Sequence, residues 1–161
     1  MNSNLIITIG REYGTGGREI GQKLALRLGV PFYDRELITR AAKKTGFDEK
    51  LFEQLDKRAT NSFLYSLTMF GSVGLNGMSL TDQLYLAQSN IIREMAEDSS
   101  CVIVGRCADH VLRDFPNKFD FFIHGSIEDR VKRVQTCGDY VIEGKTPEAA
   151  LEKMDKQRST Y

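Results

Sequence analysis

The sequence predicts a three-layer α/β/α domain, in which helices cover both faces of a parallel sheet. Three observations point to this fold class. Short apolar runs occur at Leu5–Ile9 and Cys101–Val104, and such runs are typical of buried parallel strands. Segments with apolar residues at helical spacing separate these runs along the chain. A glycine-rich segment, residues 10–17, joins the first strand to the first helix.

Composition and charge indicate an ordinary globular protein. The chain has 161 residues, of which 41% are apolar and 27% charged, so we expect a single domain with a hydrophobic core. Lys plus Arg and Asp plus Glu each number 22. The chain therefore has no overall attraction to nucleic acid or to an anionic membrane, and we expect neither as a partner.

The cysteines indicate a cytoplasmic protein. Cys101, Cys107 and Cys137 are odd in number and widely spaced, which is typical of reduced thiols rather than of disulfides. The chain has two histidines, so a zinc site is not expected. The longest apolar runs are too short to cross a bilayer, and the N-terminus does not resemble a signal peptide.

The N-terminal elements follow from periodicity and helix-ending residues. Arg18–Leu28 has apolar residues at helical spacing, and Gly29 ends this helix. Val30–Tyr33 is a second short strand. Asp34 is placed to cap the next helix, and a further charged helix is expected over Asp48–Arg58.

The C-terminal elements follow in the same way. Asn61–Ser79 mixes large apolar residues with glycines and predicts a partly helical excursion over the sheet. A helix is expected over Thr81–Glu97 and a strand over Phe119–His124. Ser126 begins another helix, and the Thr-Pro-Glu sequence at 146–148 begins the last one.

The predicted topology brings charged residues to one edge of the sheet. The carboxyl ends of parallel strands meet there, and ligands of such folds bind in the crevice outside them. The residues that follow the strands are Gly10–Arg18, Asp34, Arg35, Gly105 and Arg106. Glycines turn backbone N–H groups inward, and a helix N-terminus adds partial positive charge. The sequence therefore predicts a phosphate-binding site.

Several segments carry a family resemblance. GREYGTGGREIG, PFYDRELI, VIVGRCADHVL, the Arg130–Arg133 helix and DKQRSTY resemble, in this order, the cytidylate kinase-like branch of the P-loop nucleoside monophosphate kinases. The resemblance implies a five-stranded parallel sheet in the order 2-3-1-4-5, with ATP bound over the glycine loop. It also implies Mg²⁺-dependent transfer of the γ-phosphoryl group of ATP to a nucleoside monophosphate, with CMP or dCMP as the acceptor.

The glycine loop departs from the usual P-loop, which ends in Gly-Lys followed by Ser or Thr. Gly17 stands in place of the lysine, and Glu19 stands in place of the hydroxyl that binds magnesium. Arg18 could supply the missing cation, because its charge is permanent and it contacts phosphate oxygens in pairs. Glu19 is either a magnesium ligand or a favourable charge at the positive end of its helix.

The resemblance assigns roles to individual residues. The phosphates of ATP are expected on Gly10, Arg11, Gly14, Thr15, Gly16, Gly17 and Arg18. The acceptor is expected on Asp34, Arg35, Arg106 and Asp109. The transferring phosphoryl group is expected to contact Arg18, Arg130 and Arg133, beneath a lid that carries Lys153, Lys156 and Arg158.

Each assignment has a plain structural alternative. Asp34 has a complete explanation as a helix cap. Arg11 and Glu12 could simply solvate an exposed turn. Asp109 could contact the base, hold Arg106 or lie on a plain helix surface. The basic residues after 130 could belong to solvated helices with acidic partners.

The chain is expected to be one kinase-like domain over 1–161. Its acceptor-binding insertion is expected over 48–80 and its lid over 130–161. Members of the family usually continue into a fifth strand, so we expect an incomplete C-terminus. Strand four, Phe119–His124, then becomes an apolar edge, and such an edge favours pairing with another chain. We therefore expect either a homodimer that forms through this strand, or a chain that is the ordered part of a longer protein.

Two other functions compete with a nucleoside monophosphate kinase. One is a nucleotide-binding regulatory protein that has lost catalysis, favoured by the altered loop. The other is a kinase for another small phosphoacceptor.

Overall fold

A computed structural model describes residues 4–34, 80–138, 140 and 146–159. The strands are β1 (Ile6–Arg11), β2 (Phe32–Tyr33), β3 (Cys101–Val104) and β4 (Lys118–Ile123). The helices are α1 (Gly17–Leu28), α5 (Leu80–Asp98), α6 (Ala108–Val111), α7 (Ile127–Thr136) and α8 (Pro147–Ser159). The predicted α/β fold class is confirmed.

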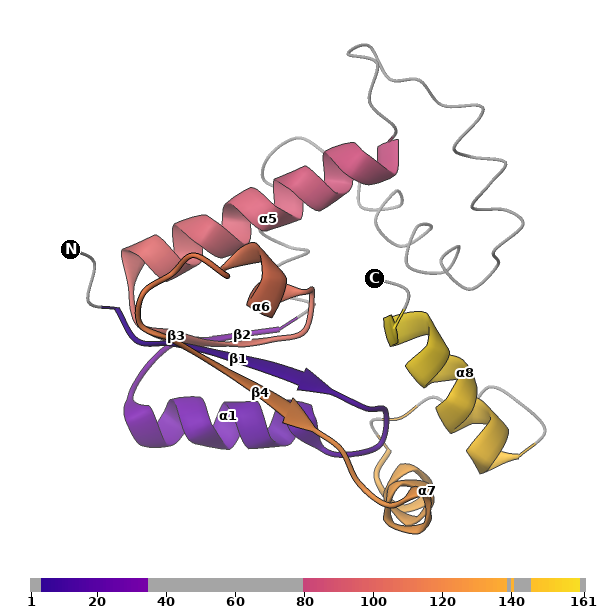
Figure 1. The fold of residues 1–161 in the computed structure, drawn as a ribbon. Coiled ribbons are helices and arrows are strands. Elements are labelled where there is room, and N and C mark those ends of the chain that lie inside the picture. The colour runs from indigo at the N-terminus through magenta and orange to yellow at the C-terminus, as the bar shows by residue number, and fades with distance from the viewer. Residues whose placement is uncertain (1–3, 35–79, 139, 141–145, 160–161) are drawn as a thin grey trace.

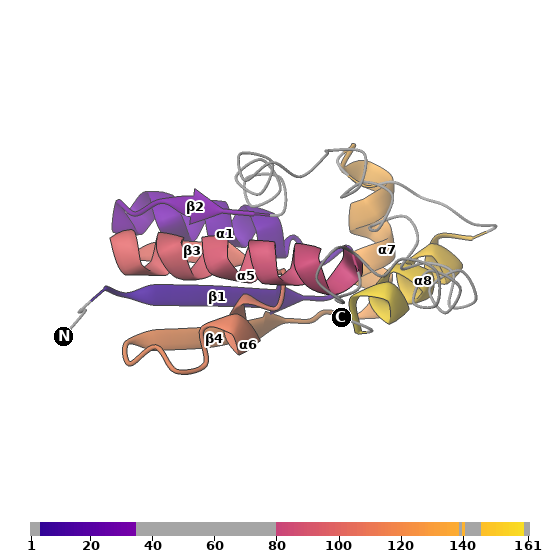
Figure 2. The same ribbon diagram turned by 90° about the horizontal axis from the view of Figure 1, so that it is seen from above.

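The described strands form one parallel sheet in the order β2-β3-β1-β4. In β1, Ile6 lies opposite Cys101 of β3 and Lys118 of β4. Helix α1 covers one face of the sheet, and α5 and α6 cover the other (Figure 1). Helices α7 and α8 lie beyond the carboxyl ends of β1 and β4 in both views (Figures 1 and 2). A fifth strand stays a prediction.

Alternation along β1 builds two cores, because successive strand residues point to opposite faces of a sheet. Ile6 is fully buried in the cluster that includes residues of α5 and α6. Ile7 and Ile9 point the other way and pack with Ala25 of α1. The buried run Cys101–Val104 contributes residues to both cores, which explains why this strand is apolar throughout.

The predicted helix ends are mostly confirmed. Gly29 ends α1 with a φ of 66°. The N–H of Val30 donates to the carbonyl of Ala25 at 3.1 Å, so Val30 completes this cap instead of starting the second strand as predicted. Ser126 caps α7 by accepting from the N–H of Asp129 at 3.2 Å.

Gly21 lets α1 lie close to the sheet. A Cβ at this buried position would lie 2.7 Å from Cγ2 of Val104 and 3.0 Å from Cε2 of Phe32. We expect Gly21→Ala to lower the free energy of unfolding by about 1–3 kcal/mol, the usual cost of overpacking a core. Urea denaturation measures this loss. Gln22→Ala on the exposed side of α1 is the control, and an equal loss in both variants would contradict the close approach.

At the edge of the described sheet, β4 combines exposed aromatic residues with charge. Phe119, Phe121 and Phe122 are each more than half exposed. Lys118 Nζ donates to Asp120 Oδ2 at 2.5 Å, and this hydrogen bond helps to lower the pKa of Asp120 against the effect of its burial. Apolar residues on an edge favour pairing with another chain, whereas charges oppose it. The homodimer stays a prediction.

Burial protects Cys101 chemically. Its exposed fraction is 0%, and burial raises the pKa of its thiol to about 11. Because the thiolate is the reactive form, we expect iodoacetamide at about pH 8 to leave Cys101 unmodified in the folded chain. Cys137 is partly exposed and should react first. Mass spectrometry of the alkylated peptides measures both rates, and equal rates would contradict this core.

Some predictions lie outside the described residues. These are the helix over 48–58, the excursion over 61–79, Arg35 and nearly all of the 48–80 insertion. Among the described residues, no helix is long and apolar enough to cross a membrane.

Candidate phosphate-binding site

A glycine loop that contains residues with positive φ joins β1 to α1. Gly14 and Gly16 have φ values of 82° and 76°, which favour glycine. Gly16 is the N-cap residue of α1, and no side chain there accepts a hydrogen bond from the first turn. Thr15 Oγ1 donates to the carbonyl of Glu12 at 2.9 Å and tightens the loop. This arrangement leaves the helix N-terminus suited to an anion.

Arg18 and Asp34 form an ion pair beside the loop. Arg18 Nε donates to Asp34 Oδ2 at 2.7 Å. The Asp34 side chain is 7% exposed, and that of Arg18 is 52% exposed. The pair links the start of α1 to the end of β2. Asp34 therefore holds Arg18 beside the loop, and the role of Arg18 as the cation in place of the P-loop lysine stays a prediction. Its predicted capping role concerns a helix outside the described residues.

Arg133 of α7 lies against the loop backbone. A Cβ at Gly16 would lie 2.7 Å from the guanidinium carbon of Arg133. Arg133 also hydrogen bonds to Glu19 of α1, and its Nε donates to Tyr140 Oη at 3.3 Å. Hydrogen bonds to Tyr140 and Glu19 raise the pKa of Arg133. The guanidinium of Arg133 therefore lies beside the glycine loop at the N-terminus of α1.

Glu19 is bound to two cations. Lys23 Nζ donates to Glu19 Oε1 at 2.6 Å, and Arg133 holds the other carboxylate oxygen. The hydrogen bond from Lys23, followed in size of effect by the one from Arg133, lowers the pKa of Glu19. No group of three or more His, Cys, Asp or Glu in the described ranges could hold a metal ion. These residues alone do not form a metal site, and magnesium binding by Glu19 stays a prediction.

Arg11 ends β1, and Arg106 lies in the loop that follows β3. A Cβ at Gly17 would lie 2.8 Å from Cβ of Arg11, and a Cβ at Gly105 would collide with the Arg11 guanidinium. Gly105, Arg106 and Cys107 all have positive φ and make a left-handed turn. Such backbone is uncommon for non-glycine residues and often marks functional sites. The end of β1 and the loop after β3 thus bring both arginines to the carboxyl edge of the sheet.

The other predicted residues are more dispersed. Gly10, in β1, faces Phe122, whose Cδ2 would lie 2.9 Å from an added Cβ. Asp109 lies in the first turn of α6, and its carbonyl accepts from Lys118 Nζ at 2.9 Å. Lys153 and Lys156 are exposed on α8.

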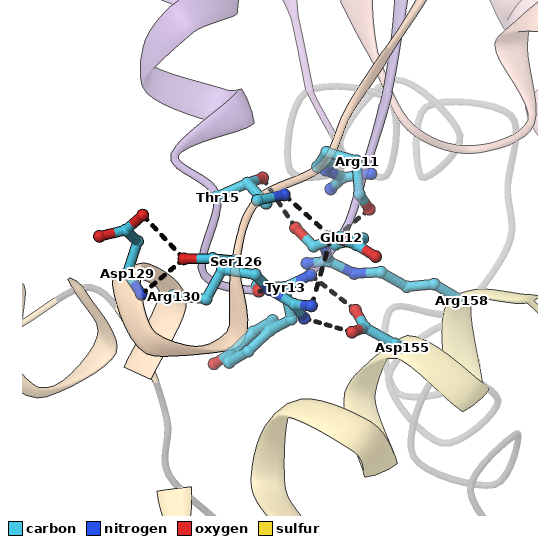
Figure 3. Close-up of polar contacts among 10 residues, drawn as sticks. Arg11, Glu12, Tyr13, Thr15, Ser126, Asp129, Arg130, Asp155 and Arg158 are labelled. Carbon is cyan, nitrogen blue, oxygen red and sulfur yellow. Dashed lines mark hydrogen bonds and ion pairs between the residues drawn. The ribbon is translucent and has the colours of Figure 1, made fainter. Parts of the chain in front are cut away.

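Arg130 and Arg158 bind the loop from α7 and α8, as Figure 3 shows. Arg130 is 6% exposed, and its Nε donates to the carbonyl of Tyr13 at 2.8 Å. Its Nη1 lies 3.2 Å from Glu12 Oε2, and its Nη2 donates to Asp155. Arg158 Nη1 donates to the carbonyl of Arg11 at 3.1 Å. Both arginines contact protein groups of the loop in this structure.

Tyr13 and Asp155 were not predicted as residues of the site. The N–H of Tyr13 donates to Asp155 Oδ1 at 2.7 Å, and the Tyr13 ring is buried against α7 and α8. A large aromatic residue inside a glycine loop was the available signal, because such a side chain must pack against another element. The sequence contained no comparable signal for Asp155.

Comparisons with known proteins identify the family and the fold. The model of the cytidylate kinase-like family matches residues 6–161. An uncharacterized protein from Eubacterium ventriosum has a similar structure, with 33% identity, a TM-score of 0.67 and coverage of 99% of this chain and 78% of that chain. A comparison with curated proteins gave no match.

Two shikimate kinases share the fold at lower identity. That of Acinetobacter baumannii, solved with shikimate, has 16% identity and a TM-score of 0.51, covering 99% of this chain and 78% of its own. That of Bacteroides thetaiotaomicron has 19% identity and a TM-score of 0.50, covering 96% and 83%.

Proposed function

Because the chain belongs to the cytidylate kinase-like family, we propose that it transfers the γ-phosphoryl group of ATP to a nucleoside monophosphate, with CMP or dCMP as the acceptor. The family implies in general a nucleotide and a metal ion. The proposal includes Mg²⁺, which would enter bound to the nucleotide phosphates, as this ion commonly does.

One observation carries the proposal: cations surround a glycine loop at a helix N-terminus. Arg18 and Arg133 flank the start of α1. The Arg11 side chain packs beside Gly17, and its guanidinium lies beside Gly105. A triphosphate carries several negative charges, and phosphoryl transfer is catalysed mainly by positioning and charge stabilisation. Arginines suit this task because their charge is permanent and their geometry matches phosphate oxygens.

Each residue then has a defined task. An oxygen of the acceptor monophosphate forms a bond to the γ-phosphorus, while the bond from that phosphorus to the bridging oxygen of ADP breaks. Arg18, held by Asp34, would stabilise charge on the donor phosphates. Arg133, over Gly16, would stabilise the transferring group, and Arg106 would hold the acceptor phosphate.

A coupled assay that reports ADP formation tests the acceptor. ATP and Mg²⁺ are supplied with CMP, dCMP, UMP, AMP or GMP, and shikimate serves as a non-nucleotide acceptor. We expect ADP formation that depends on CMP or dCMP. If ADP forms with shikimate but with none of the nucleotide acceptors, the chain is instead a kinase for another small phosphoacceptor.

The regulatory alternative is favoured by the two ion pairs at the loop. Arg18 is bound by Asp34 and Arg133 by Glu19, and the usual lysine is replaced by Gly17. A chain that binds ATP but forms no ADP with any acceptor would support this alternative and contradict the kinase proposal.

A further inference from the structure

We propose that Tyr13 is an anchor that positions the phosphate loop on α7 and α8, and that Arg130 and Asp155 hold this anchor in place. In this assignment Arg130 is a positioning residue, whereas Arg133 is the cation of α7 that faces bound phosphate. The inference rests on the proposed function, since it describes how the same loop is prepared for a nucleotide.

The side chain of Tyr13 is buried between the two helices. Its exposed fraction is 7%, and it packs with Val134 of α7 and Leu151 of α8. Its ring meets that of Tyr140 edge-on, with centroids 5.3 Å apart. The guanidinium carbon of Arg158 lies 5.1 Å from the Tyr13 ring centroid. These contacts fix a loop residue by the same packing that forms a core.

Both backbone polar groups of Tyr13 are bound by charged side chains. Its N–H donates to Asp155 of α8, and its carbonyl accepts from Arg130 of α7. Arg130 and Asp155 also bind each other. Charge-assisted hydrogen bonds are stronger than neutral ones, and this ring of three residues joins the loop to both helices. Figure 3 shows the three residues facing one another.

The next residue, Gly14, connects the anchor to the phosphate-facing part of the loop. A Cβ at Gly14 would lie 3.0 Å from Cγ1 of Val134, 3.1 Å from the carbonyl of Arg130 and 3.2 Å from Cδ2 of Leu151. The loop backbone therefore rests directly on α7 and α8. A displacement of either helix would move the loop, and a misplacement of about 1 Å can reduce catalysis about 100-fold.

The surroundings of the two arginines of α7 separate their roles. The Arg130 side chain is 7% exposed and lies between two carboxylates, those of Glu12 and Asp155. The Arg133 side chain is 34% exposed, pairs with Glu19 and lies against Gly16. Arg130 is thus directed to the protein, and Arg133 to the place where a phosphate would bind.

Calorimetric titration of the full chain with ATP tests the anchor, with CMP titrated separately. Tyr13→Phe keeps the ring packing and should bind ATP more tightly than Tyr13→Ala does. Tyr13→Ala and Asp155→Ala should weaken ATP binding about tenfold or more, which corresponds to about 1.4 kcal/mol. Asp155→Asn retains an acceptor for the Tyr13 N–H and should fall between Asp155→Ala and the wild type. CMP binding should not change.

Controls separate positioning from folding. Glu152→Gln lies on the exposed side of α8 and should bind ATP normally. Hydrogen exchange of the peptide that contains Tyr13 should be faster in Asp155→Ala than in Asp155→Asn. If Asp155→Ala does not fold, the graded comparison of Asp155→Asn with the wild type decides.

Three results would overturn the anchor: unchanged ATP binding in Tyr13→Ala and Asp155→Asn, weakened binding of CMP alone, and a wild-type chain that does not bind ATP. The last result also contradicts the proposed function. If the wild type binds ATP and the graded losses appear, but no phosphoryl transfer occurs, the anchor stands and the proposed kinase activity fails.

Discussion

Replacing Arg18 by alanine is expected to reduce phosphoryl transfer about 100- to 1,000-fold, the usual effect of removing one group that stabilises transition-state charge. Arg18 follows Gly17, which stands where the P-loop lysine is usual, and Asp34 holds its Nε at 2.7 Å. The variant would leave the donor phosphates without this cation. Steady-state kinetics with ATP and the preferred acceptor measure the loss.

Arg18→Ala should also lower stability. The Arg18 side chain is half exposed, but that of Asp34 is 7% exposed, so the variant leaves a buried carboxylate without this partner and should lower the free energy of unfolding by about 1–3 kcal/mol. Arg27→Ala removes an exposed arginine from the last turn of the same helix and is the matched control. Arg18→Lys restores a charge without the bidentate geometry and should be intermediate. Normal turnover by Arg18→Ala would show that the loop cation lies elsewhere.

Gly16→Ala is expected to reduce transfer about 100-fold, because it disturbs both the backbone and a cation of the site. Gly16 has a φ of 76°, and the added Cβ would lie 2.7 Å from the guanidinium carbon of Arg133. The loop and Arg133 cannot both keep their positions. Steady-state kinetics measure the loss of activity, and urea denaturation measures the accompanying loss of stability.

Gly29→Ala is the control for the effect of positive-φ backbone strain alone. Gly29 lies at the other end of α1 with a similar φ of 66°, and a Cβ there would meet nothing within 4 Å. Both variants should lose about 1 kcal/mol of stability to left-handed strain. Only Gly16→Ala should lose activity. Equal activity in the two variants would contradict the placement of Arg133 over the loop.

Much of the fold could be predicted from local sequence. The β-branched runs at Leu5–Ile9 and Cys101–Val104 become strands because both faces of a parallel sheet are buried. Ser126 caps α7 as expected, because its side chain accepts from a nearby N–H. Helix α6 was not predicted as an element, since Ala108–Val111 is too short to show helical periodicity.

The site could be predicted in outline. Because ligands of such folds bind at the carboxyl edge of the parallel sheet, Arg18, Asp34 and Arg106 were predicted to lie in one region. The ion pairs could not be predicted, because they join residues far apart in the chain. Arg130 and Tyr13 are 117 positions apart, and no local pattern connects them. Helical spacing placed Arg130 and Arg133 on one face, but only packing distinguishes the buried arginine from the more exposed one.

Following the γ-phosphoryl group itself tests the central claim most directly. The chain is incubated with Mg²⁺, CMP and ATP that carries radioactive phosphorus in the γ position, and the products are separated by chromatography. The proposed function predicts that the label appears in CDP, and that Arg18→Ala slows this labelling about 100- to 1,000-fold. Label that stays in ATP, or that appears only as inorganic phosphate while ATP and CMP are both bound, would contradict the proposal.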